Sequence, residues 1–110
     1  MTALLFICAG GFFGAIARFV VFRYVSIKER ATFIVNVSGS FVIGAAMQLI
    51  TAEWLYFFFV LGFLGAYTTF STFTLDVVQL YATSKRSAYM YAARTVLYSL
   101  LAVLVGYYIV

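Results

Sequence analysis

Four long apolar segments follow one another along the chain, separated by short polar stretches. The apolar segments cover about residues 3–24, 32–51, 54–81 and 88–110. Each of them reaches or exceeds the roughly 20 residues that a helix needs to cross the hydrocarbon core of a bilayer. The polar stretches between them are too short to hold a separate domain. The pattern therefore predicts an all-α membrane protein, with residues 1–110 forming a single domain of four transmembrane helices.

The composition supports this class and excludes a soluble protein. Hydrophobic residues make up 66% of the chain and charged residues 9%, which is more apolar surface than a soluble core of 110 residues can bury. The first segment is long and no basic region precedes it, so we expect a spanning helix of the mature protein rather than a cleaved signal peptide. Cys8 lies inside that segment and is expected to be an inert buried thiol.

The third segment contains a polar stretch in its middle. It reads Gly65-Ala66-Tyr67-Thr68-Thr69-Phe70-Ser71-Thr72-Phe73. Backbone at membrane depth leaves the helical conformation only where protein or a water-filled cavity satisfies its N–H and C=O groups. The sequence therefore predicts a third helix that is broken near residues 65–69, beside a site for an ion or a substrate.

Several polar side chains of the other segments are expected at membrane depth. Asn36 has two N–H donors and one acceptor that a single helix cannot satisfy, so it either bridges helices or lines a wet path. Tyr91, Thr95 and Ser99 are four residues apart and fall on one stripe of the fourth helix. The stripe is either a track of hydroxyls for a hydrogen-bond acceptor, or an interfacial tyrosine followed by two incidental hydroxyls.

Two aromatic and three charged residues complete the candidate set. Phe70 and Phe73 share a face after the break, where they either pack or turn their ring edges, which are partly positive, toward a small anion. Arg18 and Arg94 have no acidic residue in their own segments and either snorkel or mark the path of an anion. Asp76 is the acid well inside a span, where it either pairs with a basic residue or caps a pathway.

Small residues recur at four-residue spacing in three of the segments. The pairs are Gly10 and Gly14, Ser40 and Gly44, and Gly62 and Ala66. Such pairs let helices approach closely, either inside one chain or between subunits. Because four helices leave little room for an internal pathway, we expect the protein to be an oligomer.

The absence of catalytic groups leaves three classes of function. Histidine is absent, and the lone cysteine and the three acids form no plausible catalytic set, so we do not expect an enzyme. A small multidrug transporter needs a membrane carboxylate, typically in its first helix, and the first segment has none. A non-conducting structural subunit would use the polar stripes for packing, and a channel would use them to line a path.

Three motifs in a fixed order span almost the whole chain. They read Gly10-Gly11-x-x-Gly14-Ala15-x-x-Arg18, Thr32-x-x-Val35-Asn36-x-x-Gly39-Ser40-Phe41 and Gly62-Phe63-x-Gly65-x-x-Thr68-Thr69-Phe70-Ser71-Thr72-Phe73. Together they resemble the Fluc (CrcB) fluoride channel family. The resemblance implies an antiparallel, dual-topology dimer with two pores in a bacterial inner membrane. Its function would be the passive export of cytoplasmic fluoride, which relieves fluoride toxicity.

The same resemblance implies roles for individual residues. A fluoride pore would be lined by Phe70, Phe73, Asn36, Tyr91, Thr95 and Ser99, with Arg18 near the vestibule. Backbone carbonyls around Gly65 and Thr68 would hold a structural sodium ion at the dimer centre. The chain departs from the family pattern at Ala31, Ala66, Asp76 and Val103. The last of these leaves the hydroxyl track of the fourth helix shorter.

Basic residues gather in the connections on one side of the expected bundle. They are Arg23, Lys28, Arg30, Lys85 and Arg86, whereas the Ala52-Glu53 hairpin and both termini contain neither lysine nor arginine. The positive-inside rule then predicts that both termini lie outside. An antiparallel dimer of a chain committed to one orientation needs an oppositely oriented partner. We therefore expect a paralogous subunit as the alternative to a homodimer.

Overall fold

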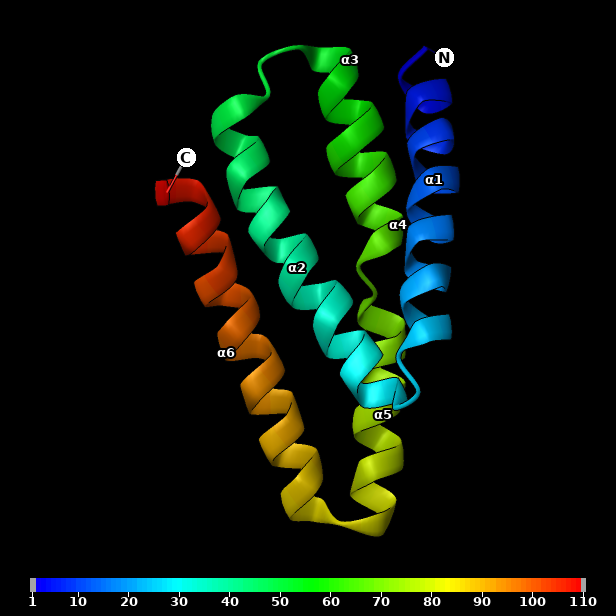
Figure 1. Ribbon diagram of the computed structural model, residues 1–110, viewed down its shortest axis with the longest axis vertical. Helices are drawn as coiled ribbons and strands as arrows, with labels where there is room; N and C mark the ends of the chain where they lie inside the picture. Colours follow the sequence, from blue (N-terminus) through cyan, green and yellow to red (C-terminus); the bar gives the residue numbers. More distant parts are fainter. Residues whose placement is uncertain (1, 110) are drawn as a thin grey trace.

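The computed structural model describes residues 2–109, which form helices and the short links between them (Figure 1). The elements are α1 (Thr2–Tyr24), α2 (Lys28–Leu49), α3 (Glu53–Leu55), the π-helical η1 (Tyr56–Leu64), α4 (Gly65–Tyr67), α5 (Phe70–Thr83) and α6 (Lys85–Ile109). Four helical stretches are long and apolar enough to cross a membrane, and the third of them, Glu53–Thr83, contains α3 to α5. The prediction of an all-α protein with four membrane-spanning segments is confirmed.

The membrane helices pack as two pairs that meet near α5. α1 lies along η1 and α4, α2 lies along α6, and α5 packs against α6. Both termini lie at the end of the bundle where α2 connects to α3, and the connections α1–α2 and α5–α6 lie toward the other end (Figure 1). The α5–α6 hairpin extends beyond the α1–α2 connection (Figure 1). The longest dimension is 45 Å, which matches the roughly 40–45 Å of a bilayer with its headgroups.

The helices continue beyond the apolar segments at the basic end of the bundle. α2 begins at Lys28 rather than at the predicted Thr32, and α6 begins at Lys85 rather than at the predicted Ala88. Charged residues end an apolar segment, but lysine, arginine and glutamate are good helix formers and do not end a helix. The extra turns place basic side chains where membrane and water meet.

Glycines bring the paired helices into backbone contact. A Cβ atom on Gly44 of α2 would overlap the carbonyl oxygen of Val103 in α6, and one on Gly106 would overlap that of Phe41. In the other pair, a Cβ atom on Gly62 would lie 2.6 Å from a carbonyl oxygen of α1. Side chains larger than hydrogen would therefore force these helices apart. Of the two roles considered for Gly44 and Gly62, packing inside one chain is the one that the structure shows.

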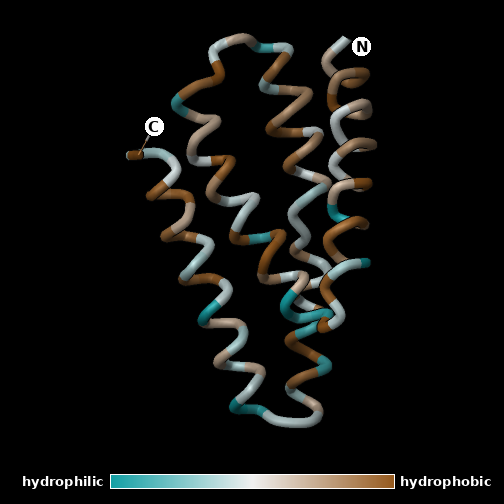
Figure 2. Tube along the Cα trace, in the orientation of Figure 1, coloured by the Kyte–Doolittle hydropathy of each residue, from teal (hydrophilic) through white to brown (hydrophobic). Residues whose placement is uncertain are grey.

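The outer surface of the bundle is apolar. Phe19 on α1, Met47 on α2 and Leu100 on α6 are all more than half exposed, and hydrophobic residues recur along all the helices in Figure 2. Lipid is the solvent that suits such a surface, and the chain is a multi-pass membrane protein. Cys8 lies on this surface and is exposed, so the expectation of a buried thiol is wrong. In a bundle of four helices, most of each helix faces outward.

Candidate functional site

The third membrane-spanning stretch leaves the helical conformation at Thr68 and Thr69. Thr68 has φ −77° and ψ 154°, and Thr69 has φ −145° and ψ 112°, both of which are extended. Tyr67 ends α4 and Phe70 begins α5, so carbonyls at the end of α4 and amides at the start of α5 lose their helical partners. The Thr69 side chain accepts a hydrogen bond from the amide of Thr72 at 3.2 Å and thereby caps α5.

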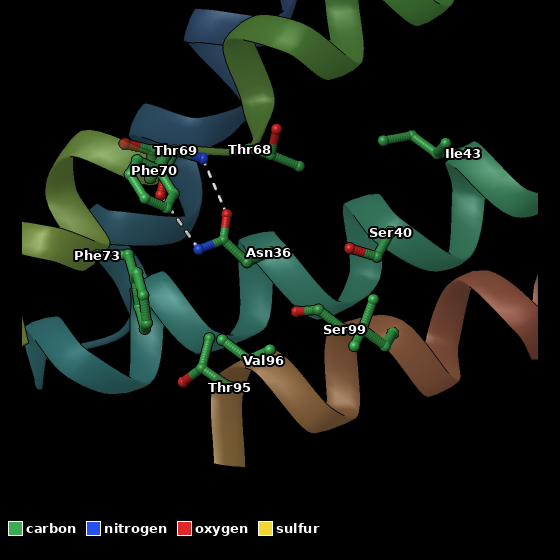
Figure 3. Close-up of a pocket in the computed structure, with 11 residues that line it drawn as sticks. Asn36, Ser40, Ile43, Thr68, Thr69, Phe70, Phe73, Thr95, Val96 and Ser99 are labelled. Carbon is green, nitrogen blue, oxygen red and sulfur yellow. Dashed lines mark hydrogen bonds between the residues drawn. The ribbon is translucent and has the colours of Figure 1, made fainter. Parts of the chain in front are cut away.

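Asn36 of α2 is bonded to this extended backbone. Its Nδ2 donates to the carbonyl oxygen of Thr69 at 3.1 Å, and the Thr69 N–H donates to its Oδ1 at 2.8 Å (Figure 3). In an uninterrupted helix the Thr69 N–H would bond to the carbonyl oxygen of Gly65 instead. The carboxamide therefore bridges two helices, and its second Nδ2 hydrogen is available to another acceptor.

A pocket of about 280 Å³ lies beside the interruption. Its lining comes from α2, α5, α6 and the extended link, and it includes Asn36, Ser40, Thr68, Thr69, Phe70, Phe73, Thr95 and Ser99. Figure 3 shows the phenylalanines of α5 on one side of Asn36 and the hydroxyl residues of α6 on another. Five of the six residues expected to line a pore thus share one pocket. Sequence reasoning did not place Ser40 or Thr69 there, although Ser40 follows Asn36 by four residues on the same face of α2.

Two hydroxyls of this pocket are buried without a partner. Among residues 2–109, the Oγ1 atom of Thr95 and the Oγ atom of Ser99 are inaccessible and form no hydrogen bond. Hydroxyls in membrane helices commonly bond to their own backbone, as Ser38 does with the carbonyl oxygen of Ile34 at 2.6 Å. A buried donor that lacks a partner costs free energy. Thr95 and Ser99 are therefore free to donate to a ligand that accepts hydrogen bonds.

The two phenylalanines of the pocket have different surroundings. The Phe70 side chain is 78% exposed on the surface of the chain. Phe73 is partly buried, and its ring centroid lies 5.6 Å from that of Tyr91 and 6.1 Å from that of Phe70. Phe73 therefore combines a packing role with a face on the pocket, whereas Phe70 offers most of its ring to something outside the chain.

Tyr91, the sixth expected residue, is bonded to a buried carboxylate instead of lining this pocket. Its hydroxyl donates to Oδ2 of Asp76 at 3.2 Å, and Oγ1 of Thr32 donates to the same atom at 2.8 Å. The ammonium of Lys28 lies 3.4 Å from Oδ1 of Asp76, so Asp76 pairs with a basic residue, one of the two roles considered for it. Sequence reasoning did not identify Lys28 and Thr32 as its partners. Their four-residue spacing, which puts both on one face of α2, was the available signal.

The other predicted site residues lie outside the pocket or at its edge. Arg18 is half-buried and lines a separate hollow that also contains Thr72 of α5. Gly65 is exposed on the surface of the chain and Thr68 is partly exposed. The structure describes no cluster of three His, Cys, Asp or Glu side chains within residues 2–109. A cation near Gly65 would therefore have to bind backbone carbonyl oxygens.

The chemistry of the pocket suits a small anion. Hydroxyls, a carboxamide and aromatic rings line it together with the aliphatic Ile43, Val96 and Leu100, and none of its lining residues is charged. The N-terminus of α5, where the helix dipole is positive, opens at the same place. Neutral donors can replace the hydration shell of an ion without holding it too tightly to leave. The fold and the site together define a small multi-pass membrane protein with a candidate anion pathway.

Comparison with known proteins gives the family. The family described as "CrcB-like protein, Camphor Resistance (CrcB)" matches residues 5–107. The chain is 34% identical over 113 residues to "Fluoride-specific ion channel FluC 2" of Bacillus cereus, a match that covers 96% of this chain and 95% of the relative. It is 38% identical over 121 residues to "Fluoride-specific ion channel FluC" of Francisella tularensis subsp. mediasiatica, covering 97% and 93%. "Fluoride-specific ion channel FluC 1" of Geobacillus kaustophilus is 40% identical over 84 residues, covering 73% and 72%. The chain belongs to the CrcB family, and the resemblance inferred from its three motifs is confirmed.

Proposed function

We propose that this chain is a subunit of a fluoride-selective channel that lets cytoplasmic fluoride leave the cell passively. The observation that carries the proposal is the pocket that Phe70 and Phe73 share with two buried hydroxyls without partners, those of Thr95 and Ser99. The relatives are named fluoride-specific ion channels, and this makes a channel rather than an enzyme the expected role.

The lining of the pocket matches the chemistry of fluoride. Fluoride is small and strongly hydrated, so a pore must replace its water with hydrogen-bond donors. Thr95, Ser99 and the spare Nδ2 hydrogen of Asn36 supply such donors, and ring edges of phenylalanine add partial positive charge. Because no fixed positive charge lines the pocket, binding stays weak enough for the ion to move on.

A second chain would complete the pathway. Phe70 is mostly exposed beside the pocket, and Thr68 of the extended link is partly exposed at the surface of the chain. An antiparallel dimer would place the same elements of a second chain against them. Each of two pores would then be lined by residues of both chains.

The interruption also supports a structural sodium ion at the centre of such a dimer. The Thr69 N–H donates to Asn36 rather than to the carbonyl oxygen of Gly65, which leaves an acceptor near the negative end of α4. Two such ends that face each other would repel without a cation between them. Unwound carbonyls are known ligands of sodium in membrane helices, so the groups present fit this ion.

The arrangement of basic residues supports a membrane orientation with both termini outside. The two connections that carry them lie at the opposite end of the bundle from the termini (Figure 1). In a bacterial inner membrane, this bias favours one orientation. The partner in an antiparallel dimer would then be a paralogous chain with the opposite bias. Relatives named FluC 1 and FluC 2 support the existence of such paralogues.

Efflux from liposomes tests the proposed function. The full chain, alone and after coexpression with a paralogous chain, is reconstituted into liposomes loaded with fluoride, with chloride or with tetraethylammonium. Fluoride efflux without chloride or tetraethylammonium efflux would support the channel. Proton-coupled movement of the quaternary cation would identify a multidrug transporter, and the absence of all fluxes would identify a structural subunit. Either result would contradict the proposal.

A further inference from the structure

A second hollow lies between the first turns of α2 and α6, apart from the candidate pathway. It has a volume of about 460 Å³ and is lined by Glu29, Arg30, Phe33, Ile34, Tyr91 and Arg94. It shares no lining residue with the anion pocket. The residues of this hollow therefore serve a different environment from those of the anion pocket.

The hollow continues into an apolar groove between α2 and α6. The groove has a volume of about 890 Å³, shares Phe33 and Ile34 with the hollow, and reaches Val42 on α2 and Val105 on α6. Along α2 it covers about 14 Å at 1.5 Å per residue. Its wall is mostly aliphatic and aromatic; of its two hydroxyl residues, Ser38 and Tyr98, the first is bonded to its own helix. The groove thus runs from the basic end of the bundle toward the middle of the membrane.

Two guanidinium groups without ion-pair partners line the polar end of this hollow. Among residues 2–109, the ion pair within 4.0 Å joins Lys28 and Asp76, so neither Arg30 nor Arg94 is paired with a carboxylate. Arg94 lies several turns into α6, but the α5–α6 hairpin extends beyond the α1–α2 connection (Figure 1). This stagger brings Arg94 beside the start of α2. With Glu29 as its one acid, the hollow has an excess of positive charge.

We propose that the hollow and the groove together bind one anionic phospholipid, with its phosphate at Arg30 and Arg94 and an acyl chain along the groove. Guanidinium groups bind phosphate through paired hydrogen bonds. Basic pockets between membrane helices are typical sites for anionic headgroups. The site has its charges at the basic end of the bundle and its apolar wall toward the middle of the membrane. A phospholipid has the same order, with a charged headgroup followed by acyl chains. This site goes beyond the proposed function and does not depend on fluoride conduction.

Lipid retention measured by native mass spectrometry tests the charged end of the site. The full chain in detergent is mixed with dioleoyl phosphatidylglycerol or with dioleoyl phosphatidylcholine, and bound lipids are counted. We expect the wild type to retain phosphatidylglycerol selectively, and the double variant Arg30→Gln, Arg94→Gln to bind it on the order of tenfold more weakly. The matched control is Arg23→Gln, Arg86→Gln, which removes two exposed charges outside the hollow and should retain the lipid.

A second pair of variants tests the groove without any change of charge. Ala102→Phe fills the groove and should weaken phosphatidylglycerol retention, whereas Ala93→Phe, on an exposed part of α6 outside it, should not. The thermal unfolding of each variant in detergent reports whether it is folded. Equal binding of both lipids by the wild type, or selective binding by the arginine double variant or by Ala102→Phe, would overturn the proposal.

Two further readouts separate this site from other uses of the same face. In phosphatidylcholine liposomes we expect the arginine double variant to pass fluoride at the wild-type rate. A slower rate there would make the arginines an anion vestibule and overturn the lipid site. A changed oligomeric mass in the double variant would make this face a subunit interface and would also overturn it. If the wild type passes no fluoride either alone or after coexpression with a paralogous chain, but retains phosphatidylglycerol, the proposed function fails and the lipid site stands.

Discussion

Asn36 and Thr69 exchange two hydrogen bonds across the interruption of the third membrane segment, as two neighbouring strands of a sheet would. The Asn36 carboxamide donates to the Thr69 carbonyl oxygen at 3.1 Å and accepts from the Thr69 N–H at 2.8 Å. One side chain thereby replaces partners that extended backbone loses at membrane depth. Because Phe70 is the next residue, the same pair fixes where α5 and its phenylalanines begin.

Replacing Asn36 by aspartate should stop fluoride flux. The carboxylate can still accept from the Thr69 N–H, but it opposes the Thr69 carbonyl oxygen and adds a negative charge to the anion pocket. We expect Asn36→Asp to lower fluoride efflux from liposomes by at least about tenfold, since like charges repel most strongly in a low-dielectric site. The control is Gln48→Glu, the same chemical change on the exposed end of α2 outside the pocket. Efflux at the wild-type rate from folded Asn36→Asp protein would show that Asn36 does not line the fluoride pathway.

Replacing the phenylalanines by isoleucine tests whether fluoride efflux needs the aromatic ring edge or only an apolar side chain of similar bulk. We expect Phe70→Ile and Phe73→Ile to abolish or strongly reduce fluoride efflux. The ring of Phe70 is mostly exposed, so its loss should change the stability of the single chain by less than about 0.5 kcal/mol. Phe73→Ile should also lower the unfolding temperature, because the Phe73 ring packs against Tyr91.

An exposed phenylalanine of α1 provides the control for this pair. Phe12→Ile changes the same ring on the apolar outer surface, away from the pocket, and should leave efflux unchanged. Wild-type efflux from well-folded Phe73→Ile would refute the assignment of these rings to the pore.

Replacing Thr95 by valine should lower fluoride efflux without lowering the stability of the fold. Valine has nearly the same shape and lacks the hydroxyl, which is buried without a partner. Removal of such a group is expected to be neutral or stabilising, so thermal unfolding in detergent should not occur earlier. Fluoride efflux should nevertheless fall, while Thr95→Ser, which keeps a hydroxyl, should retain most of it. Equal efflux from the valine and serine variants would show that this hydroxyl does not serve the ion.

Removing sodium should destabilise the assembly if carbonyls from two chains converge at the interruption. We expect protein purified and assayed in N-methylglucamine salts to lose oligomer stability and fluoride efflux, and to regain both when sodium is restored. Size-exclusion chromatography and liposome efflux measure the two effects. Full efflux from a stable oligomer that has never contacted sodium would contradict the structural cation.

The pocket residues that were predicted from the sequence can all be recognised from a local pattern. Thr95 and Ser99 are one turn apart on one helix, and Phe70 and Phe73 are likewise close on another, so periodicity places each pair on one face. Asn36 was identifiable because a carboxamide at membrane depth needs partners from elsewhere. Local pattern was therefore enough to select these side chains, although not to show that they meet.

The parts that sequence reasoning did not anticipate depend on how helices are staggered. Lys28 reaches Asp76 because the first turn of α2 lies at the level of the middle of α5. Arg94 belongs to an apolar segment by composition, yet it lines a hollow together with Arg30 because the α5–α6 hairpin extends past the start of α2. The position of one helix relative to another along the long axis of the bundle is fixed by packing between the segments. The hydropathy of a single segment carries no information about it.

The membrane orientation of the chain should be set by the basic residues that are not engaged in an ion pair. Lys28 is partly engaged with Asp76, so the bias rests mainly on Arg23, Arg30, Lys85 and Arg86. We expect a C-terminal alkaline phosphatase fusion to be active and a C-terminal fluorescent protein fusion to be dark, since the proposed orientation puts both termini outside.

Shifting the charge bias is the sharpest test of the proposed partner. The variant Lys85→Gln, Arg86→Gln, Thr51→Lys, Glu53→Lys moves positive charge to the other end of the bundle and leaves the Lys28–Asp76 pair intact. It should insert in both orientations, with both fusions active, and should form a conducting antiparallel dimer without a paralogous chain. The unaltered chain should need that partner to conduct. If the unaltered chain alone forms a conducting antiparallel homodimer, or if its termini are found equally on both faces, a paralogous subunit is not required and the charge bias does not set the orientation.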